Sequence, residues 1–514
     1  MKKSSLLLIT SLLSCLSGCN FLNINSSSSS SSTTTSSSSS SSSSSTTSSS
    51  SSDSYEIINV KFRDLKLELN EDGTAYYITK YLKFDKNIRL PEMYEGKNII
   101  GIKTNAFSSA GGVEDIYFPD SYVDFDSFAF SNCTTIKNYY VSDTHSKFSS
   151  IDGALYLKDQ ESLVAYPLGR NKKEVIKEGT KNILSGAFFS SQAKEIVLPE
   201  TLENISNQAF GYSKKLQEIN IPSKVTEVPD EAFDTCISLK NVLFNNNITK
   251  IGYRAFWGCA EIIDLVLPNS LKTIDKSAFE SCSNIRSIQF NEGLETIEHS
   301  AFAYCGLVEE LNFPTSLRMI GDYAFIQSTT IKSLSFNEGL ETIGEGAFYY
   351  NTSLLTVTIP SSVKSIGYDC FTSSDSALQK FVVSDDSNYY KTIDNVLFTK
   401  DGKELVCYPA DLPYLSKNTI YVVPNGTEII GDHAFYNAIT LSSITLPSSI
   451  KKIERAPFYM CRSLSEFKYL GTTEEFKLIQ TENEVFSEEL IVPWNDRYYG
   501  KISEVICSDG ILNI

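Results

Sequence analysis

Cysteine is the residue type whose spacing in this sequence most suggests chemistry. Six of the 11 cysteines follow a phenylalanine by three residues, and four of the six are spaced 23 residues apart: Cys133, Cys236, Cys259, Cys282, Cys305 and Cys461. Stacked coils would make neighbouring thiols candidates for disulfide bonds, whereas a tetrahedral metal site needs clustered ligands that one cysteine per coil does not supply. Ser213, Ser328 and Asn351 take the same position in other units. We therefore expect small buried thiols that pack as apolar groups, and a disulfide between Cys259 and Cys282 would contradict this.

Other catalytic constellations are not found in the sequence. Of three histidines, His299 and His433 lie beside a repeated Ala-Phe pair and His145 lies in an insert. There is no H-E-x-x-H motif, no phosphate loop and no nucleophile elbow, and Gly344-Glu345-Gly346 lacks the third glycine of a dinucleotide fingerprint. We predict that the protein is not an enzyme and has no catalytic, cofactor-binding or metal-binding residues. A carboxylate-based hydrolase is the least favoured alternative.

Near the N-terminus, the sequence predicts a covalent modification of one cysteine, Cys19. Two lysines and a mostly apolar run from Leu6 to Leu16 precede Leu16-Ser17-Gly18-Cys19, which resembles a bacterial lipobox. This pattern predicts a signal peptide over 1–18 and lipid attachment on the sulfur of Cys19. A lipobox at Cys15 fits less well, and an ordinary secretory signal is the other alternative. No later segment approaches the roughly 20 apolar residues of a spanning helix, so this lipid would be the membrane anchor.

Charge and composition limit the classes of partner and indicate a disordered segment. The chain has 514 residues and a net charge of −17, which disfavours nucleic acid as a partner. Residues 26–52 are all Ser or Thr, a tract with no apolar surface to offset the entropy of ordering. We predict a disordered tether over 19–52 that spans roughly 26 to 31 Å on average and about 90 Å when stretched. It would hold a folded body away from a membrane.

That body is built from a repeated unit. An Ala-Phe pair or its equivalent recurs with phenylalanine at positions 107, 130, 188, 210, 233, 256, 279, 302, 325, 348, 371, 435 and 458, and seven successive intervals are 23 residues long. Within a unit, runs such as Leu265-Val266-Leu267-Pro268 predict a short strand that ends at proline. The phenylalanines are expected to form a continuous interior column, and the glycine that follows Ile in five units is expected to allow a sharp turn. Thirteen coils at about 4.8 Å each would extend roughly 60 Å.

Four segments interrupt or flank the array. Asn70-Glu71-Asp72-Gly73 predicts a hairpin turn in an N-terminal β cap over 53–105, and it lacks the spacing of an EF-hand. Two inserts at about 141–180 and 383–425 match each other without a gap over 141–167 and 383–409. Each is expected to form a hairpin, turning at 158–160 and 400–402, that projects from the solenoid at 106–465 as a binding appendage or a decorated coil. A C-terminal cap is expected over 466–514, with Trp494 and a closing strand at 505–507.

The unit I-x-x-A-F-x-x-C-x-x-L-x-x-I-x-L-P-x-x-L-x-x-I resembles the BspA-like leucine-rich repeat family, also called the Treponema pallidum type. The resemblance covers about residues 60 to 510. It implies a right-handed leucine-rich-repeat solenoid of short parallel β-strands on one face, with short helical or extended returns. It also implies a bacterial cell-surface protein that takes part in adhesion to host, matrix or neighbouring cells, without enzyme activity or cofactor. The ligand does not transfer from the family.

The candidate ligand face is an apolar exception on an otherwise polar strand surface. Most predicted outward positions carry small or polar residues, whereas Leu243, Ile263 and Val266 fall on adjacent outward positions with Trp257 near in sequence. Clustered exposed apolar groups are typical of a binding patch. A row of tyrosines after the repeat phenylalanines is a second candidate face. We predict a lipid-anchored surface protein that binds a protein or glycan; a structural coat that self-associates is the alternative.

Overall fold

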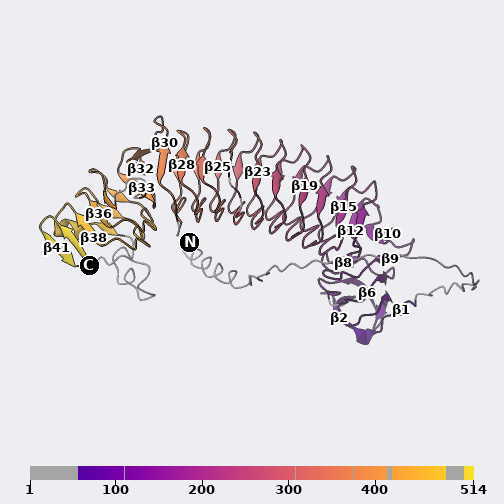
Figure 1. Ribbon diagram of the computed structural model, residues 1–514. Helices are drawn as coiled ribbons and strands as arrows, with labels where there is room; N and C mark the ends of the chain where they lie inside the picture. The colour runs from indigo at the N-terminus through magenta and orange to yellow at the C-terminus, as the bar shows by residue number, and fades with distance from the viewer. Residues whose placement is uncertain are drawn as a thin grey trace, which may run out of the picture. The chain divides into compact units, whose positions relative to one another are not determined.

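The computed structural model describes residues 56–481 and 503–513, apart from 109, 307, 309, 374, 375, 413 and 415–418. These residues fall in one compact unit, which spans Tyr55–Ile514 (Figure 1). The signal peptide, Cys19, the Ser/Thr tract and Trp494 lie outside the described residues. No helix among the described residues is long and apolar enough to cross a membrane.

The N-terminal segment contains the predicted hairpin. β2 (Leu65–Leu69) and β3 (Tyr76–Tyr81) pair antiparallel, and Gly73 in the connecting turn has φ +71°. β3 then pairs in parallel with β6 (Lys97–Ile102), which pairs with β8 (Asp124–Phe125) and with β5 (Met93–Tyr94). A second parallel sheet has the order β1 (Ile58–Asn59), β4 (Asn87–Arg89), β7 (Asp115–Tyr117) and β9 (Asn138–Tyr140), and the 3-10 helix η1 (Phe62–Asp64) precedes β2. The hairpin therefore starts a parallel ladder.

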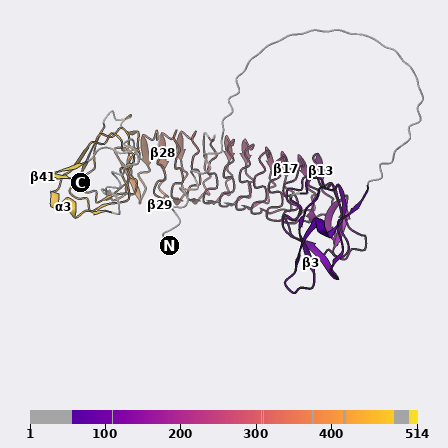
Figure 2. The same cartoon turned by 90° about the horizontal axis from the view of Figure 1, so that it is seen from below.

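The central coils form two parallel ladders. Strands of three or four residues run along one edge of the stack: β13 (Lys173–Val175), β15 (Glu195–Val197), β17 (Glu218–Asn220), β19 (Asn241–Leu243), β21 (Asp264–Val266), β23 (Ser287–Gln289), β26 (Ser333–Ser335), β28 (Thr356–Ile359) and β30 (Lys380–Val383). Two-residue strands form the other: β14 (Asn182–Ile183), β16 (Asn204–Ile205), β18 (Glu227–Val228), β20 (Lys250–Ile251), β22 (Thr273–Ile274), β24 (Thr296–Ile297), β25 (Met319–Ile320), β27 (Thr342–Ile343) and β29 (Ser365–Ile366). Figure 2 shows β28 and β29 on opposite edges.

The registers of both ladders equal the sequence period. Asp264 pairs with Ser287 and Thr273 with Thr296, in each case 23 residues apart. The solenoid of stacked parallel strands is thus confirmed, with a second ladder in addition to the expected sheet. The expected helical returns are absent from the described residues of 206–372, where turns and extended segments connect the strands.

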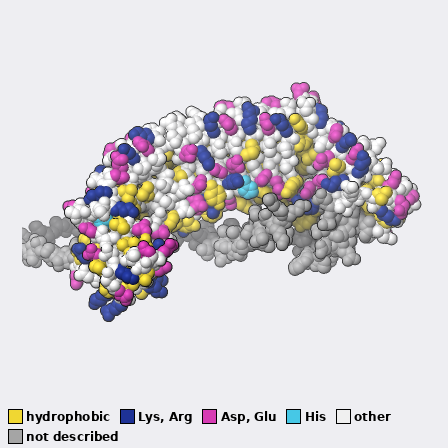
Figure 3. Space-filling model, turned by 180° about the vertical axis from the view of Figure 1, so that it is seen from behind, with side chains coloured by type: hydrophobic (Ala, Val, Ile, Leu, Met, Phe, Trp, Pro, Cys, Tyr) yellow, Lys and Arg dark blue, Asp and Glu magenta, His cyan; other side chains and the backbone are white. Residues whose placement is uncertain are grey.

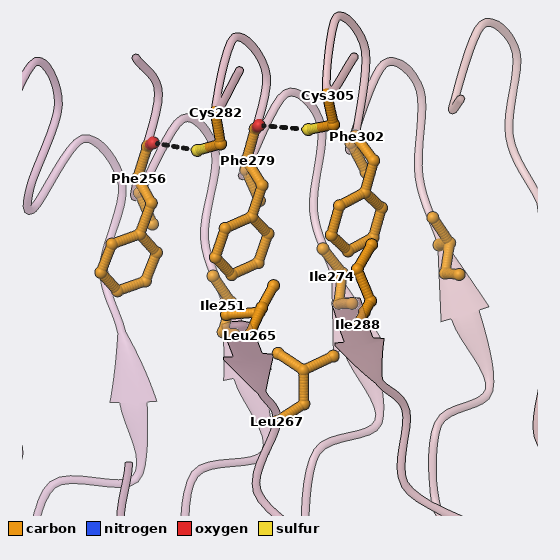
Figure 4. Close-up of a cluster of buried hydrophobic side chains, with 14 of the residues drawn as sticks. Ile251, Phe256, Leu265, Leu267, Ile274, Phe279, Cys282, Ile288, Phe302 and Cys305 are labelled. Carbon is orange, nitrogen blue, oxygen red and sulfur yellow. Dashed lines mark hydrogen bonds between the residues drawn. The ribbon is translucent and has the colours of Figure 1, made fainter. Parts of the chain in front are cut away.

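The repeat phenylalanines form the predicted column. From Phe210 to Phe348 each ring lies 5.0 to 5.3 Å from the next, centroid to centroid, and within 8° of parallel (Figure 4). The N–H of Phe279 donates to the carbonyl of Ala301 in the next coil. Ala301 is fully buried, so a larger side chain would have to displace closely packed neighbours. Each pair therefore supplies one large apolar ring and one close backbone contact.

The turn before each Ala-Phe pair has a different cause from the one expected. The residue two positions before phenylalanine is left-handed in coil after coil, as at Arg254 with φ 50°, so the sharp turn is made there. Glycines after Ile, such as Gly344 and Gly367, are not left-handed. A Cβ on Gly344 would lie 2.4 Å from the backbone nitrogen of Asp322 in the previous coil, and one on Gly367 2.3 Å from that of Glu345. These glycines are required by close approach of neighbouring backbones.

The two inserts have the same structure. The first contains β10 (Phe148–Ile151), β11 (Ala154–Leu157) and β12 (Ser162–Ala165); the second contains β31 (Tyr390–Ile393), β32 (Val396–Thr399) and β33 (Glu404–Cys407). Each forms an antiparallel meander with a register shift at the corresponding position. The turns at 158–160 and 400–402 are confirmed, but the prediction that the hairpins project is wrong. β12 pairs in parallel with β14, and β33 with β35 (Ile429–Ile430), so each insert ends as a coil of the solenoid.

The inserts also divide the hydrophobic core. The buried side chains form three clusters, spanning Val60 to Leu155, Ala154 to Cys407 and Val396 to Cys507. Leu155 belongs to the first cluster while its neighbours Ala154 and Tyr156 belong to the second. The strands of each insert are thus covered on both faces, and the insert acts as an internal boundary.

The C-terminal segment closes the array. β34 (Ile420–Val422), β36 (Ser443–Leu446), β38 (Glu466–Tyr469) and β40 (Glu504–Cys507) continue one ladder, and β35, β37 (Lys452–Ile453) and β39 (Gln480–Thr481) continue the other. β41 (Gly510–Asn513) pairs antiparallel with β40. The helix α3 (Thr473–Lys477) is held by a capping box between Thr472 and Glu475 and buries Phe476. The predicted closing strand is confirmed as β40.

Candidate interaction surface

The longer strands present one buried and one exposed row of side chains. Leu265, in the middle of β21, is 2% exposed, whereas the next residue, Val266, is 55% exposed. The strands pair in register within three sheets, β13 to β19, β21 to β23 and β26 to β30, and the repeat period continues the outward positions from one sheet to the next. The outward residues are Val175, Val197, Asn220, Leu243, Val266, Gln289, Ser335, Thr358 and Val382. This column is a regular surface that a rigid scaffold holds in place.

Three of the four predicted site residues lie together on this surface. Leu243 and Val266 hold the same position in consecutive coils and are 52% and 55% exposed, and Ile263, just before β21, is 45% exposed. We call these three residues the apolar strand patch. Exposed Asn220 and Gln289 flank it along the column. The patch is therefore an apolar area bounded by polar side chains.

Trp257 lies on a different part of the coil. It follows Phe256 in the turn, where its carbonyl accepts from the N–H of Thr235. The guanidinium carbon of Arg254 lies 4.3 Å from the centre of the indole ring, and the side chain is half-buried. The structure therefore does not place Trp257 in the apolar strand patch.

Sequence reasoning missed two further outward groups. Val175, 67% exposed, begins the same column after the first insert. On β7 and β9 the rings of Tyr117 and Tyr140 stack at 4.5 Å with Arg89 over Tyr117 at 5.3 Å. Tyr117 and Tyr140 follow Phe107 and Phe130 by ten residues, as Val266 follows Phe256, so the repeat pattern alone identifies them. Val175 is identified only when the coil that the first insert contributes is counted. The predicted row of tyrosines, in contrast, is not an exposed face: Tyr304, Tyr349, Tyr350, Tyr436 and Tyr459 are all half-buried or buried.

Charges are mixed around the strands. Lys173 pairs with Glu195 across neighbouring coils, with 2.5 Å between nitrogen and oxygen, and Lys272 pairs with Glu295 at 3.3 Å. Figure 3 shows acidic and basic side chains interspersed over the face it presents. Such exposed pairs contribute little stability each. They leave no broad basic surface on the face shown, in keeping with the net negative charge.

The cysteine ladder is buried and unpaired, as predicted, and it also has a polar role. The Sγ of Cys282 donates to the carbonyl of Phe256 at 3.2 Å, and that of Cys305 to Phe279 at 3.3 Å (Figure 4). Burial raises the pKa of the Cys282 thiol well above its ordinary value, so the thiol stays protonated. The Ser213 hydroxyl makes the equivalent bond to the carbonyl of Phe188. Asn351 donates to the carbonyl of Phe325 in the same way, whereas the buried Ser328 hydroxyl has no hydrogen-bond partner among the described residues. The position therefore favours a small side chain that can donate a hydrogen bond, which its exchange between Cys, Ser and Asn in the sequence indicated.

The sequence model of the family described as BspA type leucine rich repeat region matches the chain in six copies. The matched residues are 68–154, 170–268, 250–379 and 414–490, which is more than half of the chain. The chain belongs to the BspA-type leucine-rich repeat family. The family description names a repeat region and no reaction.

Several solved structures of bacterial repeat proteins are similar to this BspA-type chain. A leucine rich cell surface protein from Faecalibacterium prausnitzii has 22% identity over 83% of this chain and 98% of its own, with a TM-score of 0.42. A leucine-rich repeat protein from Bacteroides ovatus has 22% identity over 80% of this chain and 87% of its own, with a TM-score of 0.39. The pneumococcal vaccine antigen PcpA has 23% identity over 62% of this chain and 66% of its own, with a TM-score of 0.38. No curated protein matches the chain.

The histidines of this BspA-type chain have structural partners. His145 is fully buried, and its Nδ1 accepts from the N–H groups of Lys147 and Phe148. Burial lowers its pKa, which favours the neutral ring. His433 lies between two aspartates, with Nδ1 2.7 Å from Asp432 and 3.2 Å from Asp369. No group of three or more metal-ligating side chains is found among the described residues.

Proposed function

We propose that this BspA-type chain is a bacterial surface lipoprotein, anchored by lipid on Cys19, whose solenoid binds a protein on another cell or on extracellular matrix through the apolar strand patch. Two further features of the sequence support this proposal. A lipobox-like motif and a Ser/Thr tether precede a body that family membership assigns to leucine-rich repeats. The single observation that carries the binding surface is the exposure of Leu243, Ile263 and Val266 between polar neighbours.

Burying these three exposed apolar side chains against a partner would lower the free energy of the complex. Roughly half of each side chain is exposed, and burial of apolar surface stabilises a complex by about 25 cal/mol per Å². Their backbones belong to or adjoin parallel strands that each pair with one neighbouring strand, β19 with β17 and β21 with β23, so little conformational entropy is lost on binding. A few apolar anchors with a polar rim are typical of protein interfaces.

The test is a binding screen of the full chain against immobilised matrix glycoproteins, polysaccharides and the chain itself. Saturable binding to a foreign protein supports the proposal. Binding to polysaccharide alone, or binding to itself alone, would contradict it; the latter would favour a coat that self-associates.

A variant then locates the surface. Leu243→Ser with Val266→Ser should weaken binding to the partner at least about tenfold, because two apolar anchors are lost, and should leave thermal unfolding nearly unchanged. Val422→Ser is the matched control, since Val422 is an outward strand valine that is 58% exposed in a distant coil. Equal binding by the double variant and the control would remove the patch from the proposal.

A further inference from the structure

A cavity lies at the second insert, where one turn is shorter than in the regular coils. In an ordinary coil the repeat phenylalanine comes five positions after the ladder isoleucine, as Phe435 comes after Ile430. In the insert, Leu405 pairs with Ile430 and Tyr408 stacks on Phe435 at 4.9 Å, yet Tyr408 comes only three positions after Leu405. The insert coil is anchored at both ends but its turn is two residues short. The turns of the two flanking coils therefore approach each other across this shortened turn.

The first insert shows how such a gap can be closed. There the turn is short in the same way, from Leu163 to Tyr166. Gly186 comes so close to the preceding turn that a Cβ would lie 2.4 Å from the carbonyl oxygen of Ser127. The ring of Phe128 packs against that of Phe189 at 5.0 Å. Glycine and aromatic side chains thus fill this place at the first insert.

At the second insert ionisable residues take the equivalent positions. His433 replaces the glycine, Asp369 replaces Phe128, and Glu404 stands where the first insert has Ser162. The histidine and aspartate bridge the two turns at 3.2 Å, and a cavity of about 220 Å³ remains beside them. A water molecule takes up about 30 Å³, so the cavity has room for a small organic group.

The floor of the cavity is apolar and neutral. Ile366, Phe371 and Leu397 contribute to it, together with the thiols of Cys370 and Cys407. Burial raises the pKa of Cys407 to about 12 and that of Cys370 well above its ordinary value, so both thiols are protonated. An alkyl chain is the group that such a floor accommodates.

On the polar side of the cavity, one carboxylate has no ion-pair partner among the described residues. Asp432 pairs with Arg455 at 3.0 Å and with His433, and Glu454 pairs with Lys452 at 2.7 Å. Glu404 is half-buried, and among the described residues its carboxylate forms no ion pair or hydrogen bond. Burial, and then the charge of Glu454, raise its pKa, and the charge of Lys452 offsets part of this rise. A cationic group placed there would satisfy a carboxylate that has lost part of its hydration.

We propose that this cavity binds a primary alkylammonium group, with the ammonium against Glu404 and the alkyl chain over Leu397 and Phe371. The site lies apart from the apolar strand patch and does not depend on the proposed adhesion. The same chemistry belongs to a free alkylamine and to a lysine side chain of a protein, and both sources are compared below.

The test is titration calorimetry of the full chain with 1-aminopentane and with 1-pentanol, which has the same shape without the charge. The amine should bind saturably and at least about tenfold more tightly than the alcohol, the factor expected for a charge-assisted hydrogen bond. Equal binding of the two, or no binding of the amine, would overturn the proposal. This comparison uses the unaltered protein, so it holds even if a variant fails to fold.

Variants place the amine in the cavity. Glu404→Gln should weaken amine binding at least about tenfold, and Glu404→Lys should abolish it by supplying an ammonium from within. Glu341→Gln, at an exposed carboxylate paired with Lys364, is the matched control and should bind as the parent does. Unchanged binding by Glu404→Gln would overturn the assignment. An alanine-flanked lysine peptide and its acetyl-lysine form distinguish the sources: selective binding of the lysine form identifies a protein side chain, and binding of 1-aminopentane alone identifies a free amine.

Discussion

Phe279→Ala is the substitution whose consequences follow most directly from the stacked column. The Phe279 side chain is fully buried, with the rings of Phe256 and Phe302 at 5.2 and 5.3 Å on its two sides. Truncating a buried phenylalanine costs about 3 to 5 kcal/mol. The two stacked contacts, at about 0.5 to 1.5 kcal/mol each beyond area burial, place the loss toward the upper end of this range. Urea unfolding should show it.

The structure also predicts where the damage is felt. Because each coil contacts its neighbours, hydrogen exchange should speed up in the coils that contain Phe256 and Phe302. The N-terminal hairpin at 65–81 belongs to another core cluster and should keep its protection. Phe84→Ala, at a side chain that is 70% exposed, is the control. A loss below about 1 kcal/mol, or equal loss of protection in the hairpin, would refute nearest-neighbour stacking around a phenylalanine column.

Three further predictions concern the repeat positions and the joint at the second insert. Cys282→Ala should cost about 1 kcal/mol because a buried carbonyl loses its donor, whereas Cys282→Ser should cost less; equal losses by urea unfolding would count against the hydrogen bond. Gly344→Ala should cost about 1 to 3 kcal/mol through overpacking, while Gly306→Ala, where nothing lies within 4 Å of the added Cβ, should be neutral; equal melting temperatures would contradict this. Burial lowers the pKa of His433, but hydrogen bonds with two aspartates outweigh it and raise the pKa to about 9. The stabilisation is therefore fully present below the unfolded pKa of about 6.5 and is lost as pH rises through 9, so His433→Gln should flatten that part of the stability profile, and an unchanged profile would exclude this pairing.

The stacked ladders could be predicted from the sequence because the period itself determines the register. A 23-residue repeat places Asp264 opposite Ser287 and Phe256 beside Phe279 without any knowledge of the turns. The alternation of Leu265 and Val266 then assigns one side chain to the core and the other to solvent. Local pattern and long-range packing agree at these positions, which is typical of repeat arrays.

The inserts were harder to interpret because an insertion in sequence need not be a projection in space. Their strands are covered on both faces and their ends rejoin the ladder, which depends on packing against two neighbouring coils. The signal was Tyr166 and Tyr408, which take the place of the repeat phenylalanine and stack on Phe188 and Phe435. Trp257 shows a similar limit, since only the structure shows Arg254 lying over its ring.

Binding of a partner by the apolar strand patch should alter the hydrogen exchange of the strands that carry it. The most direct measurement is hydrogen exchange of the full chain with and without the partner found in the screen. Slower exchange is expected in peptides that cover residues 241–266, with no change in 420–446, where the control residue Val422 lies. Protection confined to other coils, with none over 241–266, would show that the apolar strand patch does not bind the partner.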